Sequence, residues 1–309
     1  MKSLHLTTYF LFFLLCLFSC EEPVELDMEV FESQVVISSN FSPSQPFHIS
    51  LSKNKDVFTN SPVEFISDAE VQILDGQGAL LNTLTFKKDV VAPYYGLTNF
   101  RPESNVNYQL SINVPGFSTI LAQDKAPNPV ALRSIQVDSV DFIGADENLY
   151  AINIQTSLAD PSKETNYYHL KLYYKAVSGR TDPNGFTGDM QTHLRPISPL
   201  VSNEENPSVI FDIDKSGVLF TDEGFNGQLI SLQFDALLDK TIAGEFPKIV
   251  GELRTVSNSY YQYHTSLSRQ LDNQDRPFAE PITVFSNIEN GLGIFAGFSV
   301  HRDSVTVIR

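Results

Sequence analysis

Short segments in which apolar and polar residues alternate occupy most of this chain, and they constrain its fold more than any other feature. In one of them Ala69, Val71 and Ile73 alternate with polar side chains, and the turn sequence Asp-Gly-Gln-Gly follows at 75–78. Alternation with a period of two places one row of side chains on each face of a strand. The sequence therefore predicts a mostly β fold.

The first half of the chain contains several such segments. Strands are predicted at 34–37, 47–51, 80–86 and 107–112. Short strands at this spacing, without helical periodicity, are typical of an antiparallel β-sandwich. Residues 31–125 are therefore expected to form a sandwich of the transthyretin-like or immunoglobulin-like kind. At the level of fold alone, such sandwiches resemble binding or spacer modules.

Two prolines mark the expected boundary between two domains. Proline removes a backbone donor and pushes the residue before it into an extended conformation. Residues 126–130 are read as a linker. Residues 131–309 are read as a second β-rich domain, with strands at 134–142, 149–156 and 167–174.

The strand predicted at 167–174 has two different faces. One carries Tyr168 and alternating leucines, which indicates a core face. The other is amphipathic, and we expect it to be partly exposed; it consists of Tyr167, His169, Lys171 and Tyr173. The polar stretch 178–208 that follows has little periodicity, and a loop of that length is either functional or mobile.

One helix is expected, at 257–272. Ser257 and its two neighbours offer N-caps, because a short polar side chain can accept a hydrogen bond from the first turn. Apolar residues then recur at helical spacing on one face; these are Tyr260, Tyr263, Leu267 and Leu271. A stripe of this kind is usually a core face, so we predict that it packs against the sheets.

The segment after the helix contains Asn290 and Gly291, which together are a strong signal for a type I′ hairpin. We expect the strands on either side of this pair to be hydrogen-bonded to each other. Gly293 and Gly297 lie within the second of these strands. Glycine inside a strand indicates a β-bulge or the close approach of another backbone.

The N-terminus has the features of an export signal. Lys2 precedes an uncharged apolar run, and Leu17 and Ser19 stand at −3 and −1 before Cys20. This arrangement resembles the lipobox of bacterial lipoproteins, in which a signal peptidase cuts before a lipid-modified cysteine. Residues 1–19 are read as a lipoprotein signal peptide, since the run is shorter than the roughly 20 residues that span a membrane. The alternatives are an ordinary cleaved signal and an N-terminal anchor helix.

Cys20 is the single cysteine left after cleavage, because Cys16 lies within the signal. A thiol consumed by lipid leaves no disulfide, no thiol nucleophile and no cysteine metal site. Residues 20–30 are read as an acidic tether, which resembles the surface-export signals of Bacteroidota lipoproteins. We expect an outer-membrane protein anchored by lipid on Cys20, and whether it faces the surface or the periplasm stays open.

The charge balance is strongly acidic. The whole chain has 21 Lys and Arg against 37 Asp and Glu, and cleavage removes one basic residue and no acidic one. Anionic nucleic acids and anionic membrane faces repel such a chain. We therefore expect no nucleic-acid partner.

One segment resembles the calcium loop of an EF-hand. Asp212, Asp214, Ser216, Gly217 and Glu223 occupy loop positions one, three, five, six and twelve. Oxygen ligands at alternate positions, a glycine turn and a distal glutamate surround calcium in that loop. The flanking residues do not predict helices, so a solvated turn between strands is the alternative to a calcium site.

Catalytic motifs are absent or out of context. Ser50 and Lys53 fit S-x-x-K, but they lie on a predicted strand and have no partner motifs. The chain contains no G-x-S-x-G, and its histidines have neither H-x-H nor H-x-x-x-H spacing, which leaves a zinc site without support. We therefore predict that the protein is not an enzyme, although no carboxylate pair can be singled out or excluded in so acidic a chain.

Four longer patterns resemble one family. They are NYYHLKLYY at 166–174, FTDEGFNG at 220–227, SYYQYHTSL at 259–267 and PFAEPITVFSNIENGLGIFAGFS at 277–299. Together with the lipid cysteine and the acidic tether, they are similar to the Bacteroidota lipoprotein family known as domain of unknown function 4249.

The resemblance implies an accessory protein of the cell envelope, because many members are found beside TonB-dependent outer-membrane transporters. It carries no catalytic residues over, since the family has none that are agreed. We therefore expect a non-catalytic binding or accessory component of a TonB-dependent uptake system. A structural or adhesion module of the cell surface is the alternative, and a polysaccharide or peptide hydrolase is a third.

Overall fold

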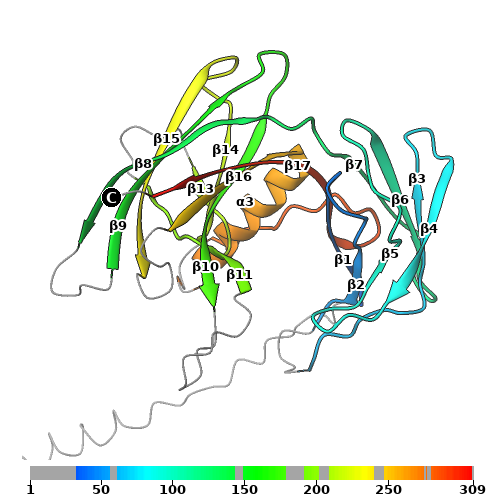
Figure 1. The fold of residues 1–309 in the computed structure, drawn as a ribbon. Helices are drawn as coiled ribbons and strands as arrows, with labels where there is room; N and C mark the ends of the chain where they lie inside the picture. The colour runs from blue at the N-terminus through cyan, green and yellow to red at the C-terminus, as the bar shows by residue number, and fades with distance from the viewer. Residues whose placement is uncertain are drawn as a thin grey trace, which may run out of the picture. The chain divides into compact units, whose positions relative to one another are not determined.

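Figure 1 shows the chain in a computed structural model. The structure describes residues 33–55, 61–142, 149–178, 191–201, 209–239, 247–274, 276 and 280–307. Residues 33–309 form one compact unit. The signal peptide, Cys20 and the tether lie outside the described residues, so these predictions stay untested.

The described strands form three sheets, which confirms the mostly β class (Figure 1). The largest has eight strands in the order β13-β14-β10-β16-β17-β1-β2, with β11 paired to β10. Its strands are β1 (Val35–Phe41), β2 (Ser50–Lys53), β10 (Tyr167–Ser178), β11 (Gln191–Pro196), β13 (Ile210–Phe211), β14 (Gly217–Thr221), β16 (Lys248–Val256) and β17 (Leu292–Thr306).

The two smaller sheets are antiparallel. The five-stranded sheet contains β3 (Glu70–Leu74), β4 (Leu80–Lys87), β5 (Tyr94–Gly96), β6 (Asn107–Asn113) and β7 (Ile120–Lys125) in the order β5-β4-β3-β6-β7. The four-stranded sheet contains β8 (Leu132–Phe142), β9 (Leu149–Ala159), β12 (Leu200–Val201) and β15 (Leu229–Asp239) in the order β12-β15-β9-β8. Strands thus lie at the positions predicted at 80–86, 107–112, 134–142, 149–156 and 167–174, whereas the strand predicted at 47–51 is shifted to Ser50–Lys53.

Both smaller sheets pack on the same face of the eight-stranded sheet. Phe41 of β1 and Phe295 of β17 belong to the core shared with the five-stranded sheet. Tyr168 of β10 and Leu253 of β16 belong to the core shared with the four-stranded sheet. The alternation of side chains places all four residues on one face, since the strands are paired in register. Burial of each such side chain contributes about 2 kcal/mol.

Strand β17 joins the two halves of the chain, because it pairs in parallel with β1 and antiparallel with β16. The expected division at 126–130 stays a prediction, and one sheet runs across it. The close backbone approach predicted for Gly293 and Gly297 is confirmed. A Cβ on Gly297 would lie 2.4 Å from the backbone N of Ala126, and one on Gly293 would lie 2.0 Å from the carbonyl O of Ile37.

The hairpin predicted around Asn290 is wrong. Asn290 does turn the chain, with a φ of 60°, but residues 281–288 form no strand. Strand β1 pairs with residues 292–297 of β17 and β16 with residues 298–306, and Glu289 bridges to Leu121 of β7 and not to β17. Instead, the Asn287 side-chain amide pairs with the backbone of Phe295, accepting from its N–H at 3.1 Å and donating to its carbonyl at 2.7 Å.

Helix α3 (Asn258–Asn273) confirms the helix predicted at 257–272. The Ser257 hydroxyl oxygen caps it by accepting a hydrogen bond from the N–H of Tyr260 at 3.2 Å. The predicted core face is only partly correct. Tyr260 is buried, but the other three apolar residues are half-buried: Tyr263, Leu267 and Leu271. Over the described ranges, no helix has the length and apolar composition needed to cross a membrane.

The predicted loop 178–208 is not loop throughout. Strand β11 pairs antiparallel with β10, and strand β12 pairs with β15. A periodicity argument misses them because β11 is mostly polar and β12 has only two residues. Residues 179–190 and 202–208 lie outside the described part of the chain, so the choice between a functional and a mobile loop is not tested there.

Candidate functional site

Helix α3 lies on the face of the eight-stranded sheet that is opposite the two smaller sheets, which we call the helix face. On the central strands this face is polar, because alternate residues of β10, β16 and β17 point to it. Two rows cross the three strands in register. They are His169, Arg254 and Val300 in one row, and Lys171, Glu252 and Arg302 in the next.

A chain of hydrogen bonds runs beneath the helix. Arg254 Nη1 lies 3.1 Å from the hydroxyl oxygen of Tyr260, which accepts the bond. The same hydroxyl lies 3.0 Å from Nδ1 of His169, whose Nε2 lies 3.1 Å from Oδ2 of Asp212. The amine of Lys171 lies 3.1 Å from the same Asp212 oxygen. These contacts link side chains of β10, β16 and α3 to the turn between β13 and β14.

Glu252 continues the network on the other side of Arg254. Its Oε1 accepts from Nε of Arg254 at 2.7 Å, and its Oε2 accepts from Nε of Arg302 at 2.6 Å. The Glu252 side chain is 2% exposed, whereas that of Arg302 is 59% exposed. The guanidinium of Arg254 also lies 4.9 Å from the ring centre of Phe298, within the range of a cation–π contact. A buried carboxylate therefore holds two arginines, one of which reaches the surface.

Burial governs the ionisation of two histidines, His169 of β10 and His264 of α3. Burial lowers the pKa of His169 to about 4, with Arg254 adding to the effect and Asp212 opposing it. Burial lowers the pKa of His264 to about 3, and His169 and Arg254 lower it further. Both imidazoles are therefore neutral at pH 7. Neutral His169 donates a hydrogen bond from Nε2 to Asp212 and accepts one at Nδ1 from the Tyr260 hydroxyl. Every hydrogen bond of the chain therefore has one donor and one acceptor.

The two carboxylates of the network stay ionised. Burial alone would raise the pKa of Asp212, but the hydrogen bond from His169 and the charge of Lys171 outweigh it and hold the pKa well below its usual range. Burial likewise opposes ionisation of Glu252, and the charge of Arg254 overcomes it, so the pKa of Glu252 is lowered. Burial raises the pKa of Tyr260, which keeps its proton.

The order carboxylate, imidazole and hydroxyl is that of a catalytic triad, with Tyr260 in the place of the nucleophile. Access decides what this arrangement can do. Tyr260 is 1% exposed and His169 is 3% exposed. The Tyr260 hydroxyl is also bound to Arg254, so both of its hydrogen-bonding roles are already taken. A substrate carbonyl has no route to this oxygen in the described structure, and the arrangement ties the helix to the sheet.

The predicted calcium residues are only partly brought together. Asp212 lies in the turn between β13 and β14, where its Oδ1 accepts from the N–H of Ser216 at 2.8 Å and from that of Gly217 at 3.1 Å. Asp214 is exposed on that turn, and Glu223 follows β14 at its far end, about 16 Å along an extended strand of five residues. Among the described residues, no group of three or more His, Cys, Asp or Glu is arranged to hold a metal ion.

The sequence contained a signal for this network that local reasoning missed. The face of 167–174 with His169 was expected to be partly exposed, and that expectation is wrong for His169, which α3 covers. Two opposite charges, Glu252 and Arg254, stand two residues apart within the apolar run 248–256. Charges with strand spacing between core residues indicate a buried ion pair, but only the fold shows that His169 lies beside them.

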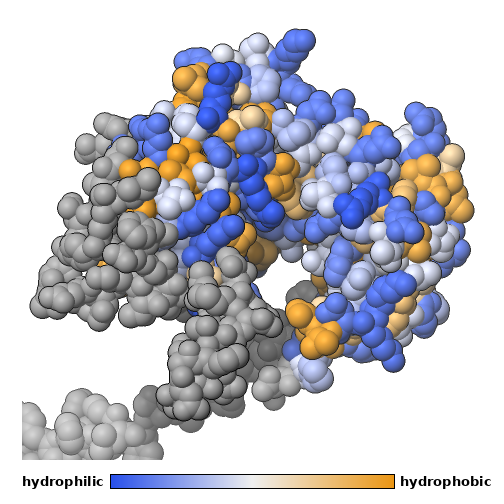
Figure 2. All heavy atoms as spheres, viewed as in Figure 1, coloured by the Kyte–Doolittle hydropathy of each residue, from blue (hydrophilic) through white to orange (hydrophobic). Residues whose placement is uncertain are grey.

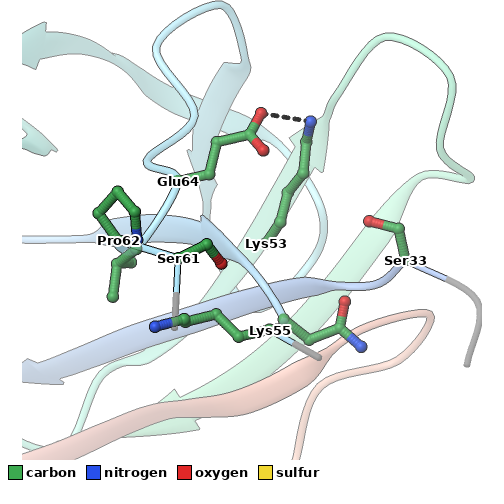
Figure 3. A pocket seen from close by; sticks show the side chains of 8 residues that line it. Ser33, Lys53, Lys55, Ser61, Pro62 and Glu64 are labelled. Carbon is green, nitrogen blue, oxygen red and sulfur yellow. Dashed lines mark hydrogen bonds and ion pairs between the residues drawn. The ribbon is translucent and has the colours of Figure 1, made fainter. Parts of the chain in front are cut away.

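Several recesses open on the described surface near charged residues, and two of them are lined by a pair of lysines. The first has a volume of about 600 Å³ and is lined in part by Ser33, Lys53, Lys55, Ser61, Pro62 and Glu64 (Figure 3). Its Lys53–Glu64 ion pair, 2.5 Å long, is exposed and contributes at most about 1 kcal/mol. This recess borders residues 56–60, which are not described, so it is not taken as a candidate site.

The second recess lies on the helix face beyond Glu252, and we call it the basic recess. Its volume is about 450 Å³. It is lined by Lys175, Leu194, Lys248, Val250, Arg302, Asp303 and Ser304. Arg302 belongs both to this recess and to the buried network, so the network orients one wall of the recess.

The chain belongs to the family described as a domain of unknown function, DUF4249, whose model matches residues 21–304. This confirms the family that the four sequence patterns resembled. No curated protein matches the sequence.

Solved structures give weak likenesses. Trypsin-activated alpha-2-macroglobulin from Escherichia coli matches with 8% identity and a TM-score of 0.22, over 74% of this chain and 15% of that one. The collagen-binding domain of the Erysipelothrix rhusiopathiae surface protein RspB matches with 10% identity and a TM-score of 0.22, over 88% and 96% of the two chains. At these TM-scores the likenesses carry no argument about fold or function.

Proposed function

We propose that this protein is a lipid-anchored, non-catalytic binding protein of the bacterial outer membrane, and that it serves a TonB-dependent uptake system. The observation that carries the non-catalytic part is the closed network beneath α3. Asp212, His169 and Tyr260 are the residues with the order of a catalytic triad, and each is buried and fully hydrogen-bonded.

The architecture supports a role in binding. Two sandwiches that share one continuous sheet form a rigid scaffold. Side chains on the surface of such a scaffold are held in fixed positions and can form a binding site. On the face seen in Figure 2, hydrophobic residues form small groups among hydrophilic ones. The protein therefore offers a mixed surface for a partner, and the basic recess is one charged feature of its described part.

The anchor rests on the sequence before Cys20, and membrane fractionation tests it. Burial of acyl chains contributes about 0.8 kcal/mol per methylene, so two or three chains hold a protein on a membrane. The wild type is expected in the outer-membrane fraction with lipid label, and Cys20→Ala is expected in the soluble fraction without it. Cys16→Ala is the matched control and should behave as the wild type. A Cys20→Ala protein that keeps its label or its membrane association would refute the anchor.

The hydrolase alternative makes a different prediction, which a substrate screen tests. Purified protein is incubated with polysaccharide and peptide libraries, and products are measured by mass spectrometry. We expect no turnover. Turnover that Asp212→Asn or Tyr260→Phe abolishes would overturn the non-catalytic assignment and show that the covered network opens in solution.

A further inference from the structure

The basic recess concentrates positive charge on an acidic protein. The chain as a whole carries a formal charge of −16. On the helix face, however, the central strands β10, β16 and β17 carry one carboxylate, Glu252, against a basic set. The basic residues are Lys171, Lys175, Lys248, Arg254 and Arg302. A local excess of this sign attracts anions that the rest of the surface repels.

Two lysines stand side by side in this recess. Tyr174 pairs with Ile249, so the next residues along the two strands, Lys175 and Lys248, continue the same register. Both line the recess and both are half-buried. Side chains directly opposite on paired strands are about 5 Å apart at Cβ, and like charges there destabilise a sheet. The fold thus tolerates an unfavourable lysine pair at the mouth of a recess.

Neither lysine is neutralised by the described residues. No ion pair or hydrogen bond joins either ammonium group to a described side chain, in contrast to Lys171 on Asp212. Arg302 directs Nε and Nη2 to Glu252, which leaves Nη1 without a described partner on a side chain that is 59% exposed. Three donor side chains with unused capacity therefore line the recess. One carboxylate, Asp303, lines it as well, and its Oδ1 accepts from the N–H of Ser304 at 2.7 Å.

The remaining lining selects for an organic ligand. Leu194 lies opposite Lys175 in the register of β10 and β11, and Val250 follows Lys248 on the same face of β16. Ser304, opposite Val250, adds a hydroxyl. Apolar walls with a few convergent polar groups are the usual composition of a small-molecule site.

We propose that the basic recess binds a small organic ligand through a group with two or more negative charges, a phosphate ester or a polycarboxylate. Lys175 and Lys248 hold the anion between two strands, and Arg302, fixed by Glu252, contacts it from the third. This inference deepens the proposed binding function, because it names a site and a ligand class. The two fail separately, since the anchor and the transporter partner do not depend on this recess.

Calorimetric titration of the purified full chain tests the proposal. The probes are inorganic phosphate and citrate, each at constant ionic strength with chloride as the balancing ion. The variant is Lys175→Gln with Lys248→Gln. Its matched control is Lys88→Gln with Lys163→Gln, which removes the same charge from exposed positions elsewhere. Loss of a charge-assisted hydrogen bond costs roughly tenfold in affinity or more, so the recess variant should bind at least about tenfold more weakly and the control as the wild type.

Protection from an amine-reactive reagent gives a second readout that needs no variant. Each probe that binds should slow modification of Lys175 and Lys248 in the wild type, and leave Lys88 and Lys163 unchanged, as measured by mass spectrometry. Binding of phosphate alone assigns a phosphate ester, and binding of citrate alone assigns a polycarboxylate. The proposal is overturned if neither probe binds, if the recess variant and its control lose affinity equally, or if all four lysines are protected alike.

Discussion

Replacement of Glu252 by glutamine should destabilise the protein strongly, because it removes the charge that holds two arginines. The Glu252 side chain is 2% exposed, and that of Arg254 is 22% exposed. Glutamine keeps the shape but turns an amide donor toward one of two guanidinium groups. Breaking a buried pair by removing one partner costs about 3–5 kcal/mol. We expect about 3 kcal/mol, the lower end of that range, since Arg302 can turn to water.

The free energy of unfolding from urea titration measures this cost, and a thermal melt should show a drop of about 6 °C at about 2 °C per kcal/mol. Arg302→Gln is the control, because it leaves Glu252 paired with Arg254 and removes an exposed partner; we expect a cost of at most about 1 kcal/mol. Two results would contradict the account of the network. One is a free energy of unfolding for Glu252→Gln within about 1 kcal/mol of the wild-type value, which is the contribution of an exposed pair. The other is an equal loss of unfolding free energy in both variants.

Three further changes test other parts of the structure. Tyr260→Phe removes the hydroxyl between Arg254 and His169 and leaves buried groups unpaired, so it should lower the free energy of unfolding in urea by about 2 kcal/mol. The control Tyr263→Phe should lower it little. An equal loss in the two variants would contradict the network. Gly297→Ala would place Cβ 2.4 Å from the backbone of Ala126, so it should lower the melting temperature far more than Gly76→Ala, whose Cβ meets its nearest atom at 3.5 Å; a Gly297→Ala protein with an unchanged melting temperature would refute this close approach. Burial raises the pKa of Asp124 to about 6 from 3.8. The carboxyl of Asp124 therefore binds a proton more tightly in the folded state than in the unfolded state, and its contribution to the free energy of unfolding falls as pH rises from about 4 to 6. Asp124→Asn should remove that part of the pH dependence between pH 4 and 7, and a profile parallel to that of the wild type would disprove it.

The strands were predictable because their pattern is local. Alternation in 69–74 and 107–112 places apolar residues on one face, and the structure buries Val71, Ile73, Leu110 and Ile112 there. The helix at 257–272 was predictable for the same reason, since the cap and the apolar spacing lie within a few turns. The burial of its polar residues Thr265 and Ser268 was not predicted.

Long-range pairing was not predictable from one sequence. The parallel contact between β1 and β17 joins residues 256 positions apart, such as Ser38 and Ile294, and no local pattern specifies that register. The wrong hairpin at Asn290 has the same cause, because the turn signal was correct and the partner strand was not local. Burial of His169 likewise follows from where α3 lies on the sheet.

The network and the basic recess share Arg302, so the buried charges of the helix face affect the arrangement of its surface. Glu252 is buried between two arginines, and a buried carboxylate of this kind adds little net stability compared with an apolar pair. It does fix the direction of a guanidinium at the surface. The buried charges are thus expected to matter for the geometry of the recess as well as for folding.

Affinity purification from outer membranes tests the binding role most directly. The tagged wild-type protein is expressed at its natural level, membranes are dissolved in mild detergent, and the proteins that copurify are quantified by mass spectrometry against a Cys20→Ala control. The account predicts that a TonB-dependent transporter copurifies in near-stoichiometric amount with the wild type and is depleted with the control. A wild-type protein that returns alone, with no transporter enriched over the control, would contradict it.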